Sequence, residues 1–325
     1  MIIKLNTLTS RLPQLLFLAL GVFLAILFLR ANKGEVQQII PLLKDARWDY
    51  LLIGMALTGM YVWLQGLMYV YSFRAVRQRL PVKTGMSLFL RRNVASTFLP
   101  MGGLTSLAFF TKRLENKGFE KGAIHVASFI YAFMGVFSVA VAALPILIYG
   151  AILEATSSLD WLVFVVTLLM VAGMTWLVKS LFARGFLFQK LAKHIRHFAE
   201  QWTQVQSEKL DWQAVWLVLL FSIGIEVVGV AHLWLAMLAL GMKVSTMAVL
   251  MGYVVQVLFL TVSPFFRGFG VIEVSLSFVL TRFGYSAAEG VAIMLLFRFF
   301  EFWLVLAMGA PVAVAYRRKD RDWKA

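Results

Sequence analysis

Long uninterrupted apolar runs constrain this chain more than any other feature of its sequence. Each run reaches about the 20 residues that an α-helix needs to cross the ~30 Å hydrocarbon core of a bilayer. The runs cover 12–30, 50–73, 123–150, 159–179, 213–240 and 290–315, with a similar one at 247–265. A transmembrane β-barrel would show alternating polarity instead. The sequence therefore predicts an all-α polytopic membrane protein in which residues 1–325 form a single integral-membrane domain.

The composition supports the same class. Of the 325 residues 61% are hydrophobic and only 14% are charged, against roughly 25% charged in soluble domains. The formal net charge is +15, but the basic residues are scattered between apolar runs. This placement indicates membrane topology and contact with anionic lipid rather than binding of nucleic acid. The chain has no cysteine, which excludes disulfides, thiolate metal sites and lipidation at cysteine.

Lysine and arginine are concentrated in 74–92, 112–121 and 317–324, whereas 151–160 has none. Because positive charge marks the cytoplasmic side, both termini are expected in the cytoplasm, at a bacterial plasma (inner) membrane, with about eight crossings. The run at 12–30 lacks a small-residue cleavage site, so we expect a retained first span rather than a removed signal. The loop 31–49 that follows this run is basic, so it fits less well on the outer side of the membrane, where this topology places it.

Two segments fit poorly as full spans because proline and glycine interrupt them. Segment 84–111 contains "FLPMGGLTS", and segment 264–283 contains "SPFFRGFG". Proline removes a backbone donor and clashes with the preceding turn, and glycine lowers helix stability further. Unsatisfied backbone in lipid is costly, so such breaks persist only where protein or a watery cavity covers them. Both segments are therefore predicted to be broken or re-entrant helices.

The two broken segments also resemble each other. In each, a proline and glycines are followed by a charged turn and then by a glycine and an aromatic residue that lead into a long span: Gly118-Phe119 in the first, Gly284-Tyr285 in the second. The chain is expected to contain repeat-like halves at about 50–150 and 213–315. Repeated discontinuous helices mark the central site of many transporters, and the N-termini of half-helices bind anions such as phosphate or carboxylate.

Residues 184–212 have a different pattern. Apolar residues recur at three- and four-residue steps while lysine, arginine and histidine fall between them. This pattern predicts a basic amphipathic helix lying on the cytoplasmic interface. An ordinary solvated connector between two spans is the alternative.

Two blocks resemble a known family. "NVASTFLPMGGLTSLAFFTKRLENKGF" is similar to the first signature of the lysylphosphatidylglycerol synthase/flippase membrane domain, and "SPFFRGFGVIEVSLSFVLTRFGYSAAEGVAIMLLFRFFEFW" is similar to the second. The resemblance implies a membrane domain that moves aminoacylated phosphatidylglycerol between leaflets. In that family a separate soluble domain attaches the amino acid, and other members are stand-alone, some linked to polyprenyl-phosphate sugars.

The chain departs from the family pattern in three ways. It ends at Ala325 without the soluble domain, so the resemblance does not extend to synthase activity, and a separate headgroup-modifying enzyme becomes an implied partner. Arg267 precedes Gly268 where the family turn is Pro-Gly-Gly-like. The first block has 104–106, "LTS", where the family often has an acidic residue. The last two departures leave open whether this chain binds the family's usual substrate.

Charged side chains inside apolar spans normally face a cavity or a partner, because a charge in lipid costs at least ~2.5–3.5 kcal/mol. Arginines would grip phosphate oxygens, acidic residues would balance charge or contact a cationic part of a headgroup, and the break glycines would let a headgroup approach the backbone. The candidate site for an anionic headgroup comprises Arg267, Gly268, Gly270, Glu273, Arg298, Glu301, Glu226, Pro100, Gly102, Gly103, Arg92 and Asn93.

Structural alternatives stand beside these assignments. Arg298 and Glu301 are spaced to share one helical face and could form an ion pair that holds spans together, as could Arg267 and Glu273. His232 and His125 are expected to be packing residues. His194 and His197 are spaced as a helical metal pair, but no third ligand accompanies them. The preferred interpretation is that they contribute charge at the membrane interface.

No nucleotide loop, His-Glu-x-x-His pair or Gly-x-Ser-x-Gly elbow is present, so the sequence predicts neither a catalytic site nor a cofactor. The leading hypothesis is a lipid translocase that binds an anionic phospholipid headgroup near the bilayer midplane. One alternative is a membrane subunit or enzyme partner that acts on an aminoacyl-phospholipid or polyprenyl-phosphate substrate. A non-transporting assembly subunit and a homo-oligomer are further alternatives.

Overall fold

The computed structural model describes residues 33–98, 114–115, 118–152, 158–194, 210–262 and 271–321, and within these ranges the ordered elements are helices. The chain folds into two compact units. Unit 1 comprises Met1–Gly59, Leu90–Ser106 and Val228–Ala325, and unit 2 comprises Met60–Phe89 and Leu107–Val227. The expected repeat-like halves follow the order of the sequence, whereas each of these units combines segments far apart in the chain.

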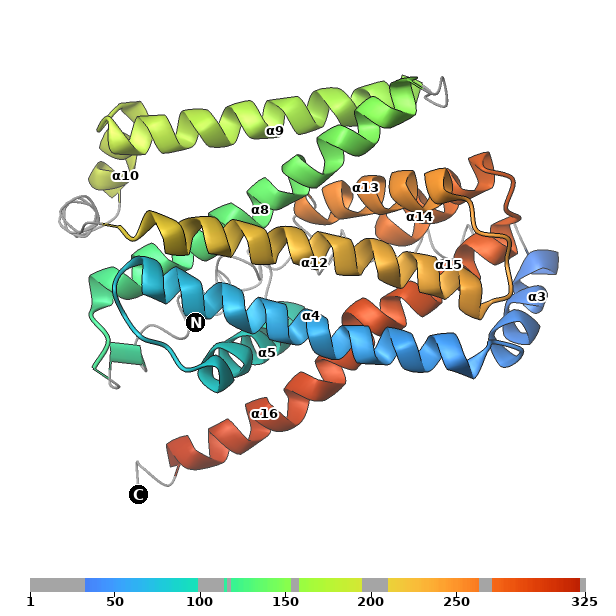
Figure 1. The fold of residues 1–325 in the computed structure, drawn as a ribbon, viewed down its shortest axis with the longest axis horizontal. Coiled ribbons are helices and arrows are strands. Elements are labelled where there is room, and N and C mark those ends of the chain that lie inside the picture. Colours follow the sequence, from blue (N-terminus) through green and yellow to red (C-terminus); the bar gives the residue numbers. More distant parts are fainter. Residues whose placement is uncertain are drawn as a thin grey trace, which may run out of the picture. The chain divides into compact units, whose positions relative to one another are not determined.

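Unit 1 is built from segments at both ends of the described chain (Figure 1). It contains the following elements: α3 (Lys33–Lys44), the first part of α4 (Trp48–Ala75), the last part of α5 (Val82–Phe98), the last part of α12 (Trp212–Ala239), α13 (Thr246–Val262), α14 (Val271–Arg282), α15 (Ala287–Arg298), η2 (Phe299–Trp303) and α16 (Leu304–Arg321). Its core is centred on Leu233, Leu276, Ile293, Phe297 and Phe300, all at most 1% exposed. These side chains come from α12, α14, α15 and η2, so burial of apolar surface ties the four elements together.

Unit 2 contains the last part of α4, the first part of α5, α8 (Lys121–Ile152), α9 (Ser158–Phe182), α10 (Phe186–His194) and the first part of α12. Helices α4 and α5 approach closely where Gly66 faces Gly85, since a Cβ on Gly85 would lie 2.5 Å from the Gly66 carbonyl oxygen. Small residues at such crossings allow backbones to come together in membrane proteins. Tyr69 stacks on Tyr131 with ring centroids 4.1 Å apart, which packs α4 against α8.

Four helices among the described residues are long and apolar enough to cross a membrane: Trp48–Ala75, Gly122–Ile152, Trp212–Ala239 and Ala287–Ala315. They coincide with the predicted spans 50–73, 123–150, 213–240 and 290–315, so the all-helical membrane class is confirmed. The apolar part of α9 is shorter, at 164–177, and that of α13 covers 246–260. The predicted first span, 12–30, lies outside the described residues. The number of eight crossings therefore stays a prediction.

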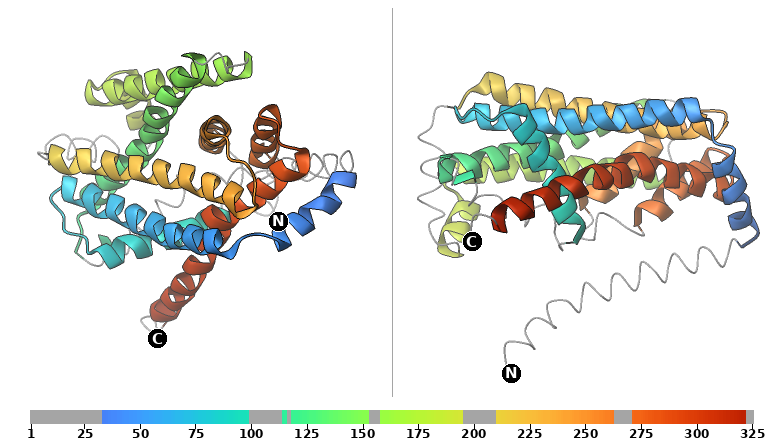
Figure 2. Two further views of the ribbon diagram at one scale, coloured as in Figure 1. Left: turned by 45° about the vertical axis from the view of Figure 1, so that its right-hand side comes forward. Right: turned by 90° about the horizontal axis from the view of Figure 1, so that it is seen from below.

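The last long span is not a uniform α-helix. Ser286 and Glu289 form a reciprocal capping box that fixes the start of α15. Five residues, Phe299–Trp303, form a π-turn, and the N–H of Leu304 donates to the carbonyl of Phe299 five residues earlier. Figure 2 shows α15, η2 and α16 continuing as one long rod in red. Such single π-turns inside α-helices occur frequently at functional sites.

Helices α13 and α14 form a hairpin in unit 1. They pack along each other, and a Cβ on Gly252 of α13 would lie 2.9 Å from Leu276 of α14 (Figure 1). The hydroxyl of Tyr285, after α14, donates to the carbonyl of Lys243 at 2.7 Å and accepts from the N–H of Ser245 at 3.1 Å, before α13. The two open ends of the hairpin are thus tied together. The predicted break at 264–270 falls between α13 and α14, outside the described residues.

The two Gly-aromatic turns that suggested a duplication have the same backbone geometry. Gly118 and Gly284 both have a positive φ, at 86° and 87°. In each turn the N–H of the following aromatic residue, Phe119 or Tyr285, donates to a carbonyl five residues earlier. Gly241, which also has a positive φ, ends α12 in the same way, since the N–H of the next residue donates to a carbonyl five residues earlier. The turn is therefore a general helix end, of the kind glycine favours, and the duplication stays a prediction.

Within the predicted interfacial helix at 184–212, the structure describes residues 184–194, which include α10, and residues 210–212. Phe186 is 68% exposed, and the ammonium of Lys190 lies 5.9 Å from the centre of its ring. An aromatic and a basic side chain thus lie one turn apart on the same face of this short helix, and the amphipathic helix at 184–212 stays a prediction. Residues 195–209 lie outside the described part of the chain.

Candidate functional site

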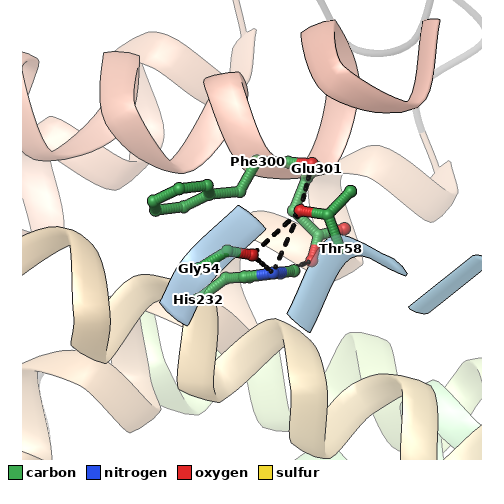
Figure 3. Close-up of polar contacts among 5 residues, drawn as sticks. All are labelled: Gly54, Thr58, His232, Phe300 and Glu301. Carbon is green, nitrogen blue, oxygen red and sulfur yellow. Dashed lines mark hydrogen bonds and ion pairs between the residues drawn. The ribbon is translucent and has the colours of Figure 1, made fainter. Parts of the chain in front are cut away.

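A buried polar cluster lies in the middle of unit 1, inside helices that are otherwise apolar. Its centre is His232 on α12, which is fully buried. One face of the imidazole stacks on the Phe300 ring of the π-turn, with centroids 5.3 Å apart and an interplanar angle of 18°. Figure 3 shows the ring near α4, α12 and the π-turn. The cluster is therefore shut off from lipid and from bulk water on the side of the histidine.

Both ring nitrogens of His232 have polar partners (Figure 3). Nδ1 lies 2.6 Å from Oε1 of Glu301 in the π-turn, and Nε2 lies 3.1 Å from the carbonyl oxygen of Gly54 on α4. The two partners come from elements far apart in the sequence. The histidine is thus the link that joins α4 to the π-turn through its ring.

The hydrogen positions in this cluster follow from the types of partner. The Gly54 carbonyl oxygen and the Glu301 carboxylate are both acceptors, so each contact is a hydrogen bond only where a hydrogen lies between its two atoms. A neutral ring beside a carboxylate supplies one such hydrogen and makes one of the two bonds, according to its tautomer. One further proton, held as imidazolium and carboxylate or as neutral imidazole and carboxylic acid, makes both bonds. A proton at this place is neutralised locally, which is what a buried site requires.

Thr58 on α4 completes the cluster. Its Oγ1 lies 3.1 Å from the Gly54 carbonyl, 3.2 Å from the Phe300 carbonyl and 3.4 Å from Nε2 of His232. The hydroxyl has one hydrogen and donates to one of these carbonyls at a time. Thr58 therefore supplies a second connection between α4 and the π-turn.

Gly54 is required by packing as well as by its carbonyl. A Cβ at this position would lie 2.4 Å from Cζ of Phe300, in a ring that is fully buried and stacked on His232. Gly59, farther along the same helix, has no atom within 4 Å of a Cβ built there. The absence of a side chain at Gly54 lets α4 reach the histidine.

A second buried polar cluster lies in unit 2, between α8 and α12. Ser138 donates to Oε1 of Glu226 at 3.1 Å, and its Oγ lies 2.7 Å from Oγ of Ser222. Ser138 also lies 3.0 Å from the carbonyl of Gly135 in its own helix. All three side chains are at most 6% exposed. These contacts place a buried carboxyl group beside hydroxyls, in contrast to the histidine partner of Glu301.

The structure gives different surroundings to the predicted residues Arg298 and Glu301. Arg298 ends α15 and is 6% exposed, so its charge is buried at the start of the π-turn. Glu301 pairs with His232 rather than completing the Arg298–Glu301 ion pair that an α-helical spacing of three suggested. The expectation of a packed His232 is met by its burial and stacking, but its ion pair with Glu301 was not predicted.

Three further predicted residues are described. Glu226 belongs to the hydroxyl cluster of unit 2 and lies six residues before His232 on the same helix. Asn93 on α5 is 3% exposed, and Arg92 next to it is half-buried. Buried Asn93 is placed in the interior of unit 1 rather than on its surface.

The remaining predicted site residues are not tested. Glu273 lies in the first turn of α14, where only the backbone is described. The residues of the two breaks lie outside the described ranges: Arg267, Gly268, Gly270, Pro100, Gly102 and Gly103.

Sequence reasoning missed the neutral members of both clusters. Thr58 and Ser138 are ordinary small polar residues in apolar spans, and their partners lie far away in the sequence. Ser222 and Glu226 are four residues apart on α12, and this spacing on one helical face could have indicated half of the unit 2 cluster. Within the ranges the structure describes, no three His, Asp or Glu side chains gather as metal ligands.

Apolar spans that enclose hydrogen-bonded charged residues define a polytopic α-helical membrane protein with a polar interior. The chain matches the family described as the lysylphosphatidylglycerol synthase TM region over residues 15–309, and it therefore belongs to that family. A search of curated proteins found no match.

Proposed function

We propose that this chain is a lipid translocase that moves a phospholipid with an anionic headgroup between leaflets of a bacterial inner membrane. The family description links the membrane region to lysylphosphatidylglycerol, a lipid whose headgroup carries a phosphate. A membrane domain of this family without catalytic motifs suits movement of the lipid better than its synthesis. Both termini are placed in the cytoplasm by this proposal, as the distribution of Lys and Arg predicts.

The observation that carries the proposal is the position of Arg298. It lies inside the apolar span Ala287–Ala315, it is 6% exposed, and it stands directly before the π-turn. Burial of a guanidinium in a membrane costs several kcal/mol, so a buried arginine in a span marks a functional site by default. The planar guanidinium binds two phosphate oxygens at once, which suits the headgroup of a phospholipid.

The two proline-glycine breaks extend the proposed site. Pro100, Gly102 and Gly103 in one, and Arg267, Gly268 and Gly270 in the other, would present free backbone N–H groups to the phosphate, as half-helix ends do in transporters. Glu273 would contact a cationic part of the headgroup, and Arg92 and Asn93 would receive the lipid. We propose that both breaks are re-entrant and belong to two related halves. The hairpin of α13 and α14 supports this for the second break, because the two helices lie on either side of it in the sequence and pack along each other.

An assay of lipid movement tests the proposal. The full chain is reconstituted in phosphatidylglycerol-containing vesicles, and fluorescent phosphatidylglycerol is quenched from outside to follow its exchange between leaflets. We expect Arg298→Gln to slow exchange and Arg298→Lys to retain part of it. The control is Arg74→Gln, at an arginine that is 59% exposed and 3.9 Å from Asp211. Equal rates in wild type and a folded Arg298→Gln variant would contradict the assignment of the site.

The family description also supports a second candidate, a membrane subunit that serves a headgroup-modifying enzyme. This role predicts that lipid exchange in vesicles is absent while a modified phospholipid or a polyprenyl-phosphate substrate copurifies with the chain. Lipid mass spectrometry on gently extracted protein distinguishes the two functions, because a translocase would retain the transported phospholipid itself.

A further inference from the structure

We propose that His232 and Glu301 form a proton-binding site, and that loading and release of its proton drive the conformational step of lipid translocation. The second half of this inference rests on the proposed function. The first half, the binding of a proton by this pair, rests on geometry within unit 1. The proton adds to the Nδ1–Oε1 contact and leaves from it, and no other covalent bond changes.

The first argument is the hydrogen count of the pair. Both partners of the ring, the Gly54 carbonyl and the Glu301 carboxylate, are acceptors, so the protonated pair makes both contacts as hydrogen bonds. A neutral ring beside a carboxylate has one hydrogen for the two contacts. Release of the proton therefore leaves a lone pair facing an acceptor either at Glu301 or at Gly54, according to the tautomer, and weakens that contact.

The second argument is the unequal exposure of the two partners. The side chain of His232 is fully buried, whereas that of Glu301 is 19% exposed. The exposed part of the pair is therefore the carboxyl group, while the imidazole stays enclosed by Phe300 and Gly54. We expect the proton to enter and leave by way of Glu301.

The third argument is the π-turn that carries Glu301. A π-turn contains one residue more than an α-helical turn, and each residue of an α-helix rotates the chain by about 100°. Conversion of Phe299–Trp303 to α-helical geometry would therefore rotate Glu301 relative to one flanking helix and remove it from His232. The pair and the π-turn stabilise each other, so protonation of the pair is coupled to the register of α15 against α16.

The surrounding groups do not replace Glu301 as the partner of the ring. From α4 the ring meets the Gly54 carbonyl and the neutral Thr58 hydroxyl. From α13 the titratable Tyr253 lies against Gly229, one turn before His232, with its hydroxyl 2.5 Å from a Cβ built there. Arg298 precedes the π-turn on α15. The contacts of the imidazole with an acidic group in the described structure are those with Glu301.

The coupling also connects the two proposed sites. Arg298, the proposed phosphate ligand, directly precedes the π-turn that contains Glu301. A change of register at this turn would move the guanidinium relative to the carboxyl group. Release of the proton and release of the headgroup would thus be two results of one rearrangement, as a coupled transporter requires.

The test has two independent readouts on the full chain in vesicles. The first is infrared difference spectroscopy with isotope-labelled glutamate, recorded as the pH is raised. We expect a carboxyl or imidazolium change in wild type that is lost in Glu301→Gln and in His232→Gln. Glutamine at 301 keeps a hydrogen bond to neutral His232 without a titrating proton, so the fold is expected to persist. The control is Glu289→Gln, which retains the capping box on the same rod because glutamine serves in that motif.

The second readout is exchange of fluorescent phosphatidylglycerol with and without an imposed pH gradient. We expect the gradient to accelerate exchange in wild type and Glu289→Gln, and this response to be lost in Glu301→Gln. Identical infrared titrations of wild type and Glu301→Gln would overturn the proton site. Exchange that ignores the gradient while the infrared change persists would overturn the coupling. A normal infrared change with no lipid exchange at all would confirm the proton site and refute the translocase.

Discussion

The two buried polar clusters of this protein use different chemistry in similar surroundings. In unit 1, His232 and Glu301 form a short contact, with Gly54 and Thr58 around the ring. In unit 2, Glu226 accepts from the hydroxyl of Ser138, which also contacts the hydroxyl of Ser222. Hydroxyls rotate and can reverse their hydrogen bonds, whereas the stacked imidazole fixes the directions of its two ring nitrogens. Loss of one partner should therefore cost far more in unit 1 than in unit 2.

The largest expected effect is that of Glu301→Ala. It leaves the fully buried His232 without its acidic partner, and removal of one member of a buried ion pair costs about 3–5 kcal/mol in soluble proteins. The matched change in unit 2, Glu226→Ala, leaves two hydroxyls that still hydrogen-bond each other, at a cost of about 1–2 kcal/mol. Unfolding of the purified variants in mixed micelles with increasing SDS compares the two. Equal losses would remove the contrast between the clusters.

Substitution of the nearest glycines should give the next largest difference. Gly54→Ala places a methyl group 2.4 Å from the buried Phe300 ring and should cost about 1–3 kcal/mol through overpacking. Gly135→Ala, beside the unit 2 cluster, meets no atom within 4 Å and should stabilise its helix by up to about 1 kcal/mol. Thermal melting in detergent measures both. A neutral Gly54→Ala would show that α4 does not depend on this close approach.

Thr58→Val should have a smaller effect, of about 1 kcal/mol, because it removes a hydroxyl while it keeps the shape of the side chain. The hydroxyl connects α4 to the Phe300 carbonyl, and hydrogen bonds between membrane helices contribute ~0.6 kcal/mol on average and at most ~1.7 kcal/mol. Thr58→Ser keeps the hydroxyl and serves as the control. The same SDS unfolding assay should place serine near wild type and valine below it. A loss in the serine variant without a loss in the valine variant would assign the effect to the methyl group.

The smallest expected effect is that of Ser138→Ala, at ~0.6 kcal/mol. Glu226 keeps a second hydroxyl nearby in Ser222, which can turn toward the carboxyl group after the change. A double-mutant cycle with Ser222→Ala measures the coupling of the two serines, and we expect the double variant to lose more than the sum of the single ones. Strict additivity would mean that the hydroxyls act independently and do not form one network.

The membrane class and the four long spans could be predicted because they depend on local runs of apolar residues, which the sequence displays directly. The charged residues in these spans could be found for the same reason: Arg298, Glu301 and Glu226 are exceptions in apolar surroundings. Their partners could not be found. His232 and Glu301 are 69 residues apart, and their contact depends on how α12 packs against the last rod.

The π-turn is the clearest case of information that the sequence does not show. An α-helical period places Arg298 and Glu301 on one face, and this spacing suggested that they pair. The extra residue of Phe299–Trp303 changes that period locally, because contacts of Phe300 with His232 and of Thr58 with the Phe300 carbonyl stabilise the wider turn. Tertiary contacts decide this geometry, so a local pattern cannot predict it.

The Tyr285 clasp at the open end of the α13–α14 hairpin has a consequence for topology mapping. Because it ties the start of α13 to the end of α14, we expect the chain to enter and leave the hairpin on the same side of the bilayer. The hairpin would then add an even number of passes at any depth of insertion. Reporters fused before α12 or after α16 would not detect its depth, and a label at 263–270 would measure it.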